Sequence, residues 1–211
     1  MGLWYGKVGL FVTLGLWMLA SLAIGLPRSI VSPFESELRA LITLNEQCPQ
    51  PCWEGIRPAI TSAGDAVARL KTLAWVGNIS AIQGIVTSDS IIRWQWKGQQ
   101  ASIIDGEREG TIWLHKGFVY SIELPLKVSF AEVWQAAGKP QDTLIIKAPR
   151  ANPTVFYHAL YIDGLIDLNG VTPCPLNAWN LLSMRVDAHF AAEKPRSPIQ
   201  QSERDGQTLC K

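Results

Sequence analysis

The sequence has few charged side chains, and the two signs nearly cancel. Charged residues make up 18% of the 211 positions, and 19 basic against 18 acidic side chains leave a net charge of +1. No run of basic residues is longer than two. Nucleic-acid-binding proteins normally carry a basic patch that neutralises phosphates, so the composition argues against a nucleic-acid partner. A hydrophobic content of 47% also argues against a disordered chain.

Motifs for catalysis are absent as well. There is no phosphate-binding glycine loop, Gly-x-Ser-x-Gly elbow, His-Glu-x-x-His pair or Asp-rich calcium loop. His115, His158 and His189 are scattered and lie far from the cysteines, which disfavours a catalytic triad or a metal site. Asp163 and Asp167 could pair as carboxylates, but Asp163 precedes a glycine and is typical of a hairpin turn. We expect no metal and no cofactor, and we favour a protein that is not an enzyme.

One long stretch of the chain carries no charge. It runs over 19 residues from Val8 to Leu26, with Lys7 before it and Pro27 after it. A helix of this length reaches about 28 Å, close to the hydrocarbon thickness of a bilayer. We expect residues 1–28 to act as a signal anchor that contacts membrane lipid through residues 8–26, giving a single-pass protein with an extracytoplasmic globular part. The alternatives are a signal peptide cleaved near Ala23, which would release a secreted protein, and a buried soluble helix.

The number of cysteines also favours an exported protein. There are four of them, Cys48, Cys52, Cys174 and Cys210. An even number of cysteines in an exported chain indicates disulfides, and several pairings are possible. The two prolines between Cys48 and Cys52 favour a turn that brings these thiols together. We predict that both are oxidised, to each other or to Cys174, and that Cys210 is unpaired or bonded to Cys174.

The rest of the sequence switches twice from helical to strand periodicity. Ser62 and Ser129 each resemble a helix N-cap, and Gly77 and Gly138 are the expected stops of the two helices. The predicted helices cover 62–73, 129–137 and 177–184, and the predicted strands cover 92–96, 111–114, 118–124, 144–147, 155–162, 165–168 and 185–190. We predict an α+β fold of two tandem helix-plus-antiparallel-sheet units behind an N-terminal transmembrane helix. The expected segments are a linker with the Cys pair at 29–52, the units at 53–126 and 127–190, and a mobile tail at 191–211.

Two stretches carry a resemblance to known proteins. Residues Gly55 to Thr61 before a short helix, and Ser129 to Ala137 followed by Gly-Lys-Pro, resemble the helix-and-sheet unit of the BamE/SmpA outer-membrane assembly lipoproteins. Two such units in tandem are similar to the fold of the β-lactamase inhibitor proteins. The Cys48 to Ile56 stretch is similar to the start of uncharacterised bacterial membrane-anchored proteins. The resemblance covers about residues 48–170 and implies a role in envelope assembly without catalytic residues.

Nine tryptophans are the remaining functional signal. Trp94 and Trp96 alternate with polar residues on a predicted strand, which favours a place in the core, with a stacking platform for carbohydrate or peptide as the alternative. On the next strand, Trp113 points outward if its neighbours point inward. Exposed Trp and Arg are frequent anchors of protein interfaces. The predicted binding residues are Arg93, Gln95, Lys97 and Trp113.

The leading functional hypothesis is a membrane-anchored, extracytoplasmic binding or envelope-assembly module that contacts a protein partner through a sheet face. The alternative is an extracytoplasmic enzyme or small-ligand receptor that uses an aromatic sheet face together with His158 or His115.

Overall fold

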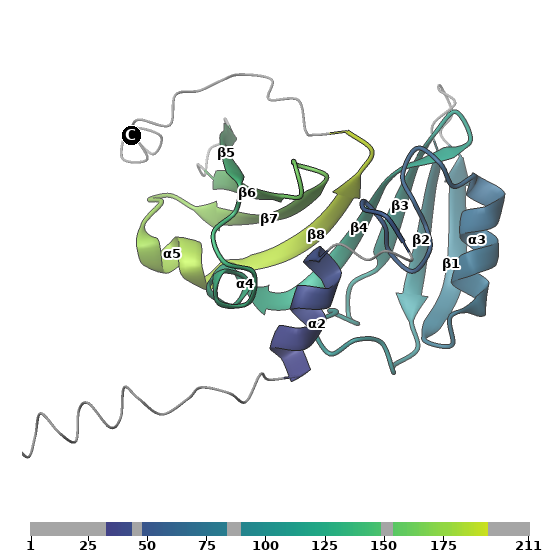
Figure 1. Ribbon diagram of the computed structural model, residues 1–211, viewed down its shortest axis with the longest axis horizontal. Coiled ribbons are helices and arrows are strands. Elements are labelled where there is room, and N and C mark those ends of the chain that lie inside the picture. Colours follow the sequence, from purple (N-terminus) through teal and green to yellow (C-terminus); the bar gives the residue numbers. More distant parts are fainter. Residues whose placement is uncertain (1–32, 44–47, 84–89, 149–153, 194–211) are drawn as a thin grey trace, which may run out of the picture. The chain divides into compact units, whose positions relative to one another are not determined.

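The computed structural model describes residues 33–43, 48–83, 90–148 and 154–193. These residues form four helices and eight strands (Figure 1). The helices are α2 (Pro33–Ile42), α3 (Ala63–Thr72), α4 (Phe130–Ala137) and α5 (Ala178–Ser183). The strands are β1 (Val76–Gln83), β2 (Ser90–Trp96), β3 (Gly110–His115), β4 (Phe118–Ser129), β5 (Asp142–Ala148), β6 (Thr154–Tyr161), β7 (Ile166–Pro173) and β8 (Arg185–Ala191).

The strands form one antiparallel sheet in the order β1-β2-β3-β4-β8-β7-β6-β5. Strands β1 to β4 follow one another in the sheet, and strands β5 to β8 do the same in the opposite direction. The two series meet where β4 pairs with β8, with Ile122 opposite Phe190 and Glu123 opposite His189 (Figure 1). This pairing satisfies the backbone groups that two exposed strand edges would otherwise leave open.

The predicted fold of two helix-plus-sheet units behind a transmembrane helix is wrong. The strands that were assigned to separate units belong to one sheet, because the edges of β4 and β8 pair with each other. In the described part of the chain, no helix is long and apolar enough to cross a membrane. Residues 8–26, on which the predicted membrane anchor was placed, lie outside the described residues.

Local capping signals place the helices. The Ser62 hydroxyl accepts a hydrogen bond from the backbone N–H of Asp65 at 3.2 Å and begins α3, and Ser129 forms a complete capping box with Glu132 at the start of α4. The expected role of Gly77 as a helix stop is wrong, because α3 ends before Leu73 and Gly77 lies in β1. A Cβ at this position would lie 3.0 Å from the carbonyl oxygen of Gln95, so the glycine permits close pairing of β1 with β2.

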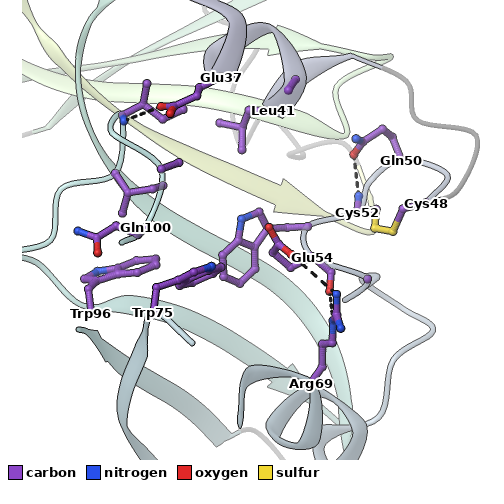
Figure 2. Close-up of a pocket in the computed structure, with 16 residues that line it drawn as sticks. Glu37, Leu41, Cys48, Gln50, Cys52, Glu54, Arg69, Trp75, Trp96 and Gln100 are labelled. Carbon is purple, nitrogen blue, oxygen red and sulfur yellow. Dashed lines mark hydrogen bonds and ion pairs between the residues drawn. A yellow bond between two sulfur atoms is a disulfide. The ribbon is translucent and has the colours of Figure 1, made fainter. Parts of the chain in front are cut away.

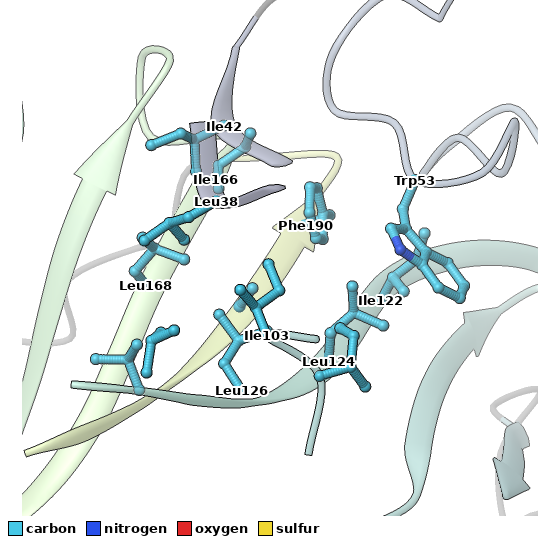
Figure 3. Packing of buried hydrophobic residues seen from close by; sticks show 14 of the residues in the cluster. Leu38, Ile42, Trp53, Ile103, Ile122, Leu124, Leu126, Ile166, Leu168 and Phe190 are labelled. Atoms are coloured by element: carbon cyan, nitrogen blue, oxygen red, sulfur yellow. The ribbon is translucent and has the colours of Figure 1, made fainter. Parts of the chain in front are cut away.

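The hydrophobic core lies on one face of the sheet. Figure 3 shows Leu38 and Ile42 of α2 close to Ile166 and Leu168 of β7, within the same buried cluster. The other described helices contribute to this cluster through Leu70 of α3, Phe130 of α4 and Leu181 of α5. The four helices therefore share one side of the sheet, and we call the opposite side the outer face.

Candidate functional site

The outer face carries a row of polar side chains across the middle of the sheet. Residues directly opposite each other in an antiparallel pair point to the same side. The register places Arg93 opposite Thr111, Thr111 opposite Glu123, Glu123 opposite His189, and His189 opposite Asp167. Apart from Gly110, the neighbours of these residues along each strand are buried apolar side chains of the core. We call these five residues, from β2, β3, β4, β8 and β7, the polar row.

At one end of the polar row, Asp167 is paired with a histidine of β6. The Nδ1 atom of His158 lies 2.7 Å from Oδ2 of Asp167, and the Asp167 residue is only 3% exposed. The other carboxylate oxygen of Asp167 is buried and has no hydrogen bond to any residue that the structure describes. Burial lowers the pKa of the neighbouring His189, although the carboxylates of Asp167 and Glu123 oppose this shift. Burial therefore favours the neutral form of His189, which lies opposite the buried Asp167.

An ion pair flanks the polar row. The guanidinium of Arg108 donates to both carboxylate oxygens of Asp187, with distances of 2.6 and 2.7 Å. This hydrogen bonding raises the pKa of Arg108 against the effect of its burial. Within the described residues, no group of three His, Cys, Asp or Glu side chains is placed to hold a metal ion.

The structure brings two of the four predicted binding residues close together. Ile91 lies opposite Trp113, and Arg93 lies opposite Thr111, so Arg93 and Trp113 are diagonal neighbours on the outer face. Trp113 is 42% exposed, and Gln95 is exposed farther along β2. Lys97 follows the last residue of β2, where its backbone N–H donates to the carbonyl of Trp75 at 2.8 Å.

Two exposed aromatic residues near Trp113 were missed by the sequence analysis. Phe118 and Tyr120 are each 49% exposed, and the rings of Tyr120 and His115 are 6.4 Å apart. The register shifts between Trp113 and Leu114, which breaks the simple alternation from which a strand face is predicted. We call Trp113, Phe118 and Tyr120 the aromatic patch.

A cavity of about 540 Å³ opens beside the core, between α2, α3, the loop that begins at Cys48 and the end of β2 (Figure 2). This volume lies within the range typical of small-ligand sites. In Figure 2, Trp75 and Trp96 lie next to each other with Gln100 beside Trp96, and Glu37 and Leu41 reach in from α2. Its lining also includes Trp53, Glu54 and Arg69.

The tryptophans of this region form a connected cluster. The Trp75 and Trp96 rings are stacked with centroids 5.5 Å apart, and the Trp53 ring is tilted against Trp75 at 5.7 Å. The indole N–H of Trp96 donates to the Arg108 carbonyl at 2.6 Å, which fixes this ring. Trp94 is fully buried and stacks on Trp53, which confirms its expected place in the core, whereas Trp96 also lines the cavity.

A disulfide borders the cavity. Cys48 and Cys52 are bonded to each other, as the sequence favoured. The side chain of Gln50 accepts from the Cys52 N–H at 2.7 Å and donates to the Thr43 carbonyl at 3.2 Å, so the loop is tied to the end of α2. Cys174 is also disulfide-bonded, and Cys210 lies outside the described residues.

No protein-family model matches this sequence, and the comparisons with curated proteins and with solved structures find no match either. The resemblance to the BamE/SmpA lipoproteins therefore stays a prediction.

Proposed function

We propose that this protein is a non-enzymatic binding module that contacts another protein through the outer face of its sheet. The observation that carries the proposal is the aromatic patch. Its three large side chains are 42% to 49% exposed on a face that none of the described helices covers. Exposed clusters of this kind mark interaction sites more often than isolated apolar residues do.

The neighbours of the aromatic patch suit an interface. Trp113 offers a large apolar surface with few rotatable bonds, so little conformational entropy is lost when a partner covers it. Arg93 lies diagonally across the strand pair and can form paired hydrogen bonds with a carboxylate of the partner. The polar row continues from Arg93 across the sheet to Asp167. Because Asp167 is a buried acidic residue, a partner that places a negative charge against this end of the row would be disfavoured.

The cysteines support a place for this module outside the cytoplasm. Cys48 and Cys52 form a disulfide, and Cys174 is also disulfide-bonded. Structural disulfides persist mainly in oxidising compartments. A role in assembling the bacterial envelope rests on the BamE/SmpA resemblance and is part of this proposal.

The test compares two exposed tryptophans on different sides of the sheet. Trp113→Ala should weaken partner binding by about 30-fold or more, because truncation of a central anchor costs about 2 kcal/mol. Trp179→Ala is the matched control, since Trp179 is 79% exposed but lies on α5, on the opposite side. A photo-reactive amino acid at Tyr120 captures the partner from native cells, and the dissociation constant is then measured with purified proteins.

Circular dichroism and urea unfolding must show that both variants remain folded. Equal affinities for the Trp113→Ala and Trp179→Ala variants would refute the proposal. Cross-linking from position 179 but not from position 120 would refute it as well.

A further inference from the structure

The cavity beside the core has a wall of indole rings. Trp75 and Trp96 are stacked 5.5 Å apart at 24°, while Trp53 is inclined by 59° to Trp75, so the rings present faces in more than one direction. Backbone pairing holds this wall in place, because Val76 lies opposite Trp96 at the start of the β1–β2 ladder. Indole faces attract cations within about 6 Å through the negative potential of the π-system.

The charged residues of the lining are more acidic than basic. Glu37 and Glu54 carry carboxylates, and Arg69 is the single basic residue among the described residues that line the cavity. Arg69 is engaged by Glu54, since its Nε donates to the Glu54 carbonyl at 2.6 Å and its Nη2 lies 3.8 Å from the Glu54 carboxylate. The cavity therefore favours a positive charge on a ligand.

The carboxylate of Glu37 is held in position from one side only. Its Oε2 accepts from the Ser102 hydroxyl at 2.8 Å and from the Ile103 N–H at 3.2 Å. Its Oε1 has no hydrogen bond to any residue of the described chain. The side-chain oxygen of Gln100, beside Trp96, is buried and also lacks a hydrogen-bond partner among the described residues. The Glu37 carboxylate therefore offers a ligand one free acceptor atom.

From these observations we propose that the cavity binds a small organic cation with an alkylammonium head group. The indoles of Trp75 and Trp96 contact the methyl groups around the charged nitrogen, and the Glu37 carboxylate balances the charge. A cavity of about 540 Å³ leaves room for a substituent beyond the head group. This inference does not depend on the outer face, because the cavity lies on the side of the sheet that carries the helices.

The test is isothermal titration of the full-length protein with choline and with 3,3-dimethylbutan-1-ol, a neutral molecule of nearly the same shape. Choline should bind at least tenfold more tightly, because only the charged molecule gains from the indole faces and from Glu37. Phosphocholine is a further probe. Tighter binding of phosphocholine than of choline would indicate that the natural ligand is a lipid head group. Weaker binding of phosphocholine would indicate that the natural ligand is a free organic cation.

Two matched variants distinguish the contribution of the Glu37 carboxylate to choline binding from the effect of removing any carboxylate from α2. Glu37→Gln should weaken choline binding about tenfold. Glu35→Gln should leave it unchanged, because Glu35 lies on the same helix but is paired with Arg39 at 2.8 Å and does not line the cavity. Trp75→Leu should weaken binding at least as much as Glu37→Gln.

Equal affinities of the wild-type protein for choline and for its neutral analogue would overturn the proposal, and this comparison needs no variant. Binding of a neutral sugar such as cellobiose without binding of choline would also overturn it and assign the cavity to carbohydrate. Unchanged choline binding in the Glu37→Gln variant would remove the assigned role of that residue and contradict the proposed site.

Discussion

Gly110, the first residue of β3, packs directly against the indole of Trp94, so a methyl group added there tests the tryptophan cluster. A Cβ at Gly110 would overlap three carbon atoms of the indole, Cε2, Cζ2 and Cη2. The indole cannot move aside easily, because Trp94 is fully buried, stacked on Trp53 at 5.3 Å and packed edge-on against Trp96 at 5.5 Å. We predict that Gly110→Ala destabilises the protein and disturbs the wall of the cavity.

The size of this effect follows from two opposing contributions. Overpacking a well-filled core costs about 1–3 kcal/mol. The backbone of Gly110 is outside the left-handed region, so alanine can adopt its conformation. Because alanine lowers the conformational entropy of the unfolded chain, the substitution also stabilises the folded state by about 0.4–1 kcal/mol. At the centre of these two ranges, the expected net loss of unfolding free energy is about 1.3 kcal/mol.

Urea unfolding followed by far-ultraviolet circular dichroism measures this loss, and the near-ultraviolet spectrum reports the coupled indoles. Gly64→Ala is the control, because its added Cβ meets only the Ser62 hydroxyl at 3.9 Å within α3. That variant should gain about 0.5–1 kcal/mol. In a double-mutant cycle with Trp94→Phe, the smaller ring should recover at least about 1 kcal/mol of the Gly110→Ala loss. A Gly110→Ala variant as stable as the wild type, or a coupling energy of zero, would show that the packing argument is incorrect.

Three further predictions concern stability. Ser129→Ala removes the capping box of α4 and should cost about 0.5–2 kcal/mol in urea unfolding, whereas Ser183→Ala, which loses a bond to a helix carbonyl, should cost much less; equal losses would contradict the capping role. Burial lowers the pKa of His189 in the folded protein. As the pH falls below about 6.5, this histidine therefore binds a proton more readily in the unfolded chain than in the folded one, and the free energy of unfolding decreases. The unfolding free energy of His189→Gln should consequently change less between pH 7 and pH 5 than that of the wild type, and equal slopes would refute this. Replacing Cys48 and Cys52 together by serine should cost about 2 kcal/mol, because the disulfide closes a short loop, and an unchanged unfolding midpoint would count against it.

The sequence by itself located most helices and strands, because their signals are local. Ser62 and Ser129 bond to backbone groups three residues away, so capping can be predicted from a few consecutive letters. The hairpin at Asp163 was located by a local signal, but its loop spans the four residues 162–165 instead of two, and Ile162 as well as Asp163 and Gly164 has a positive φ angle. The alternation around Trp94 also indicated which residues of β2 enter the core.

The outer face was predicted only in part. Alternation placed Arg93 and Trp113 on one side of the sheet, where the register makes them diagonal neighbours. Phe118 and Tyr120 were missed because a register shift beside Trp113 changes the alternation, and such a shift depends on the pairing partner rather than on the strand itself.

Only the tertiary structure decided that the strands form one sheet and that a cavity lies beside it. The pairing of β4 with β8 joins Glu123 to His189, residues that no local pattern relates, because any two free strand edges can satisfy each other's backbone groups. The cavity depends on contacts of the same kind: Glu37 of α2 is bonded to Ser102, and Arg69 of α3 to Glu54. Such contacts form only after separate segments have packed against a common core, so the order of residues along the chain does not reveal them.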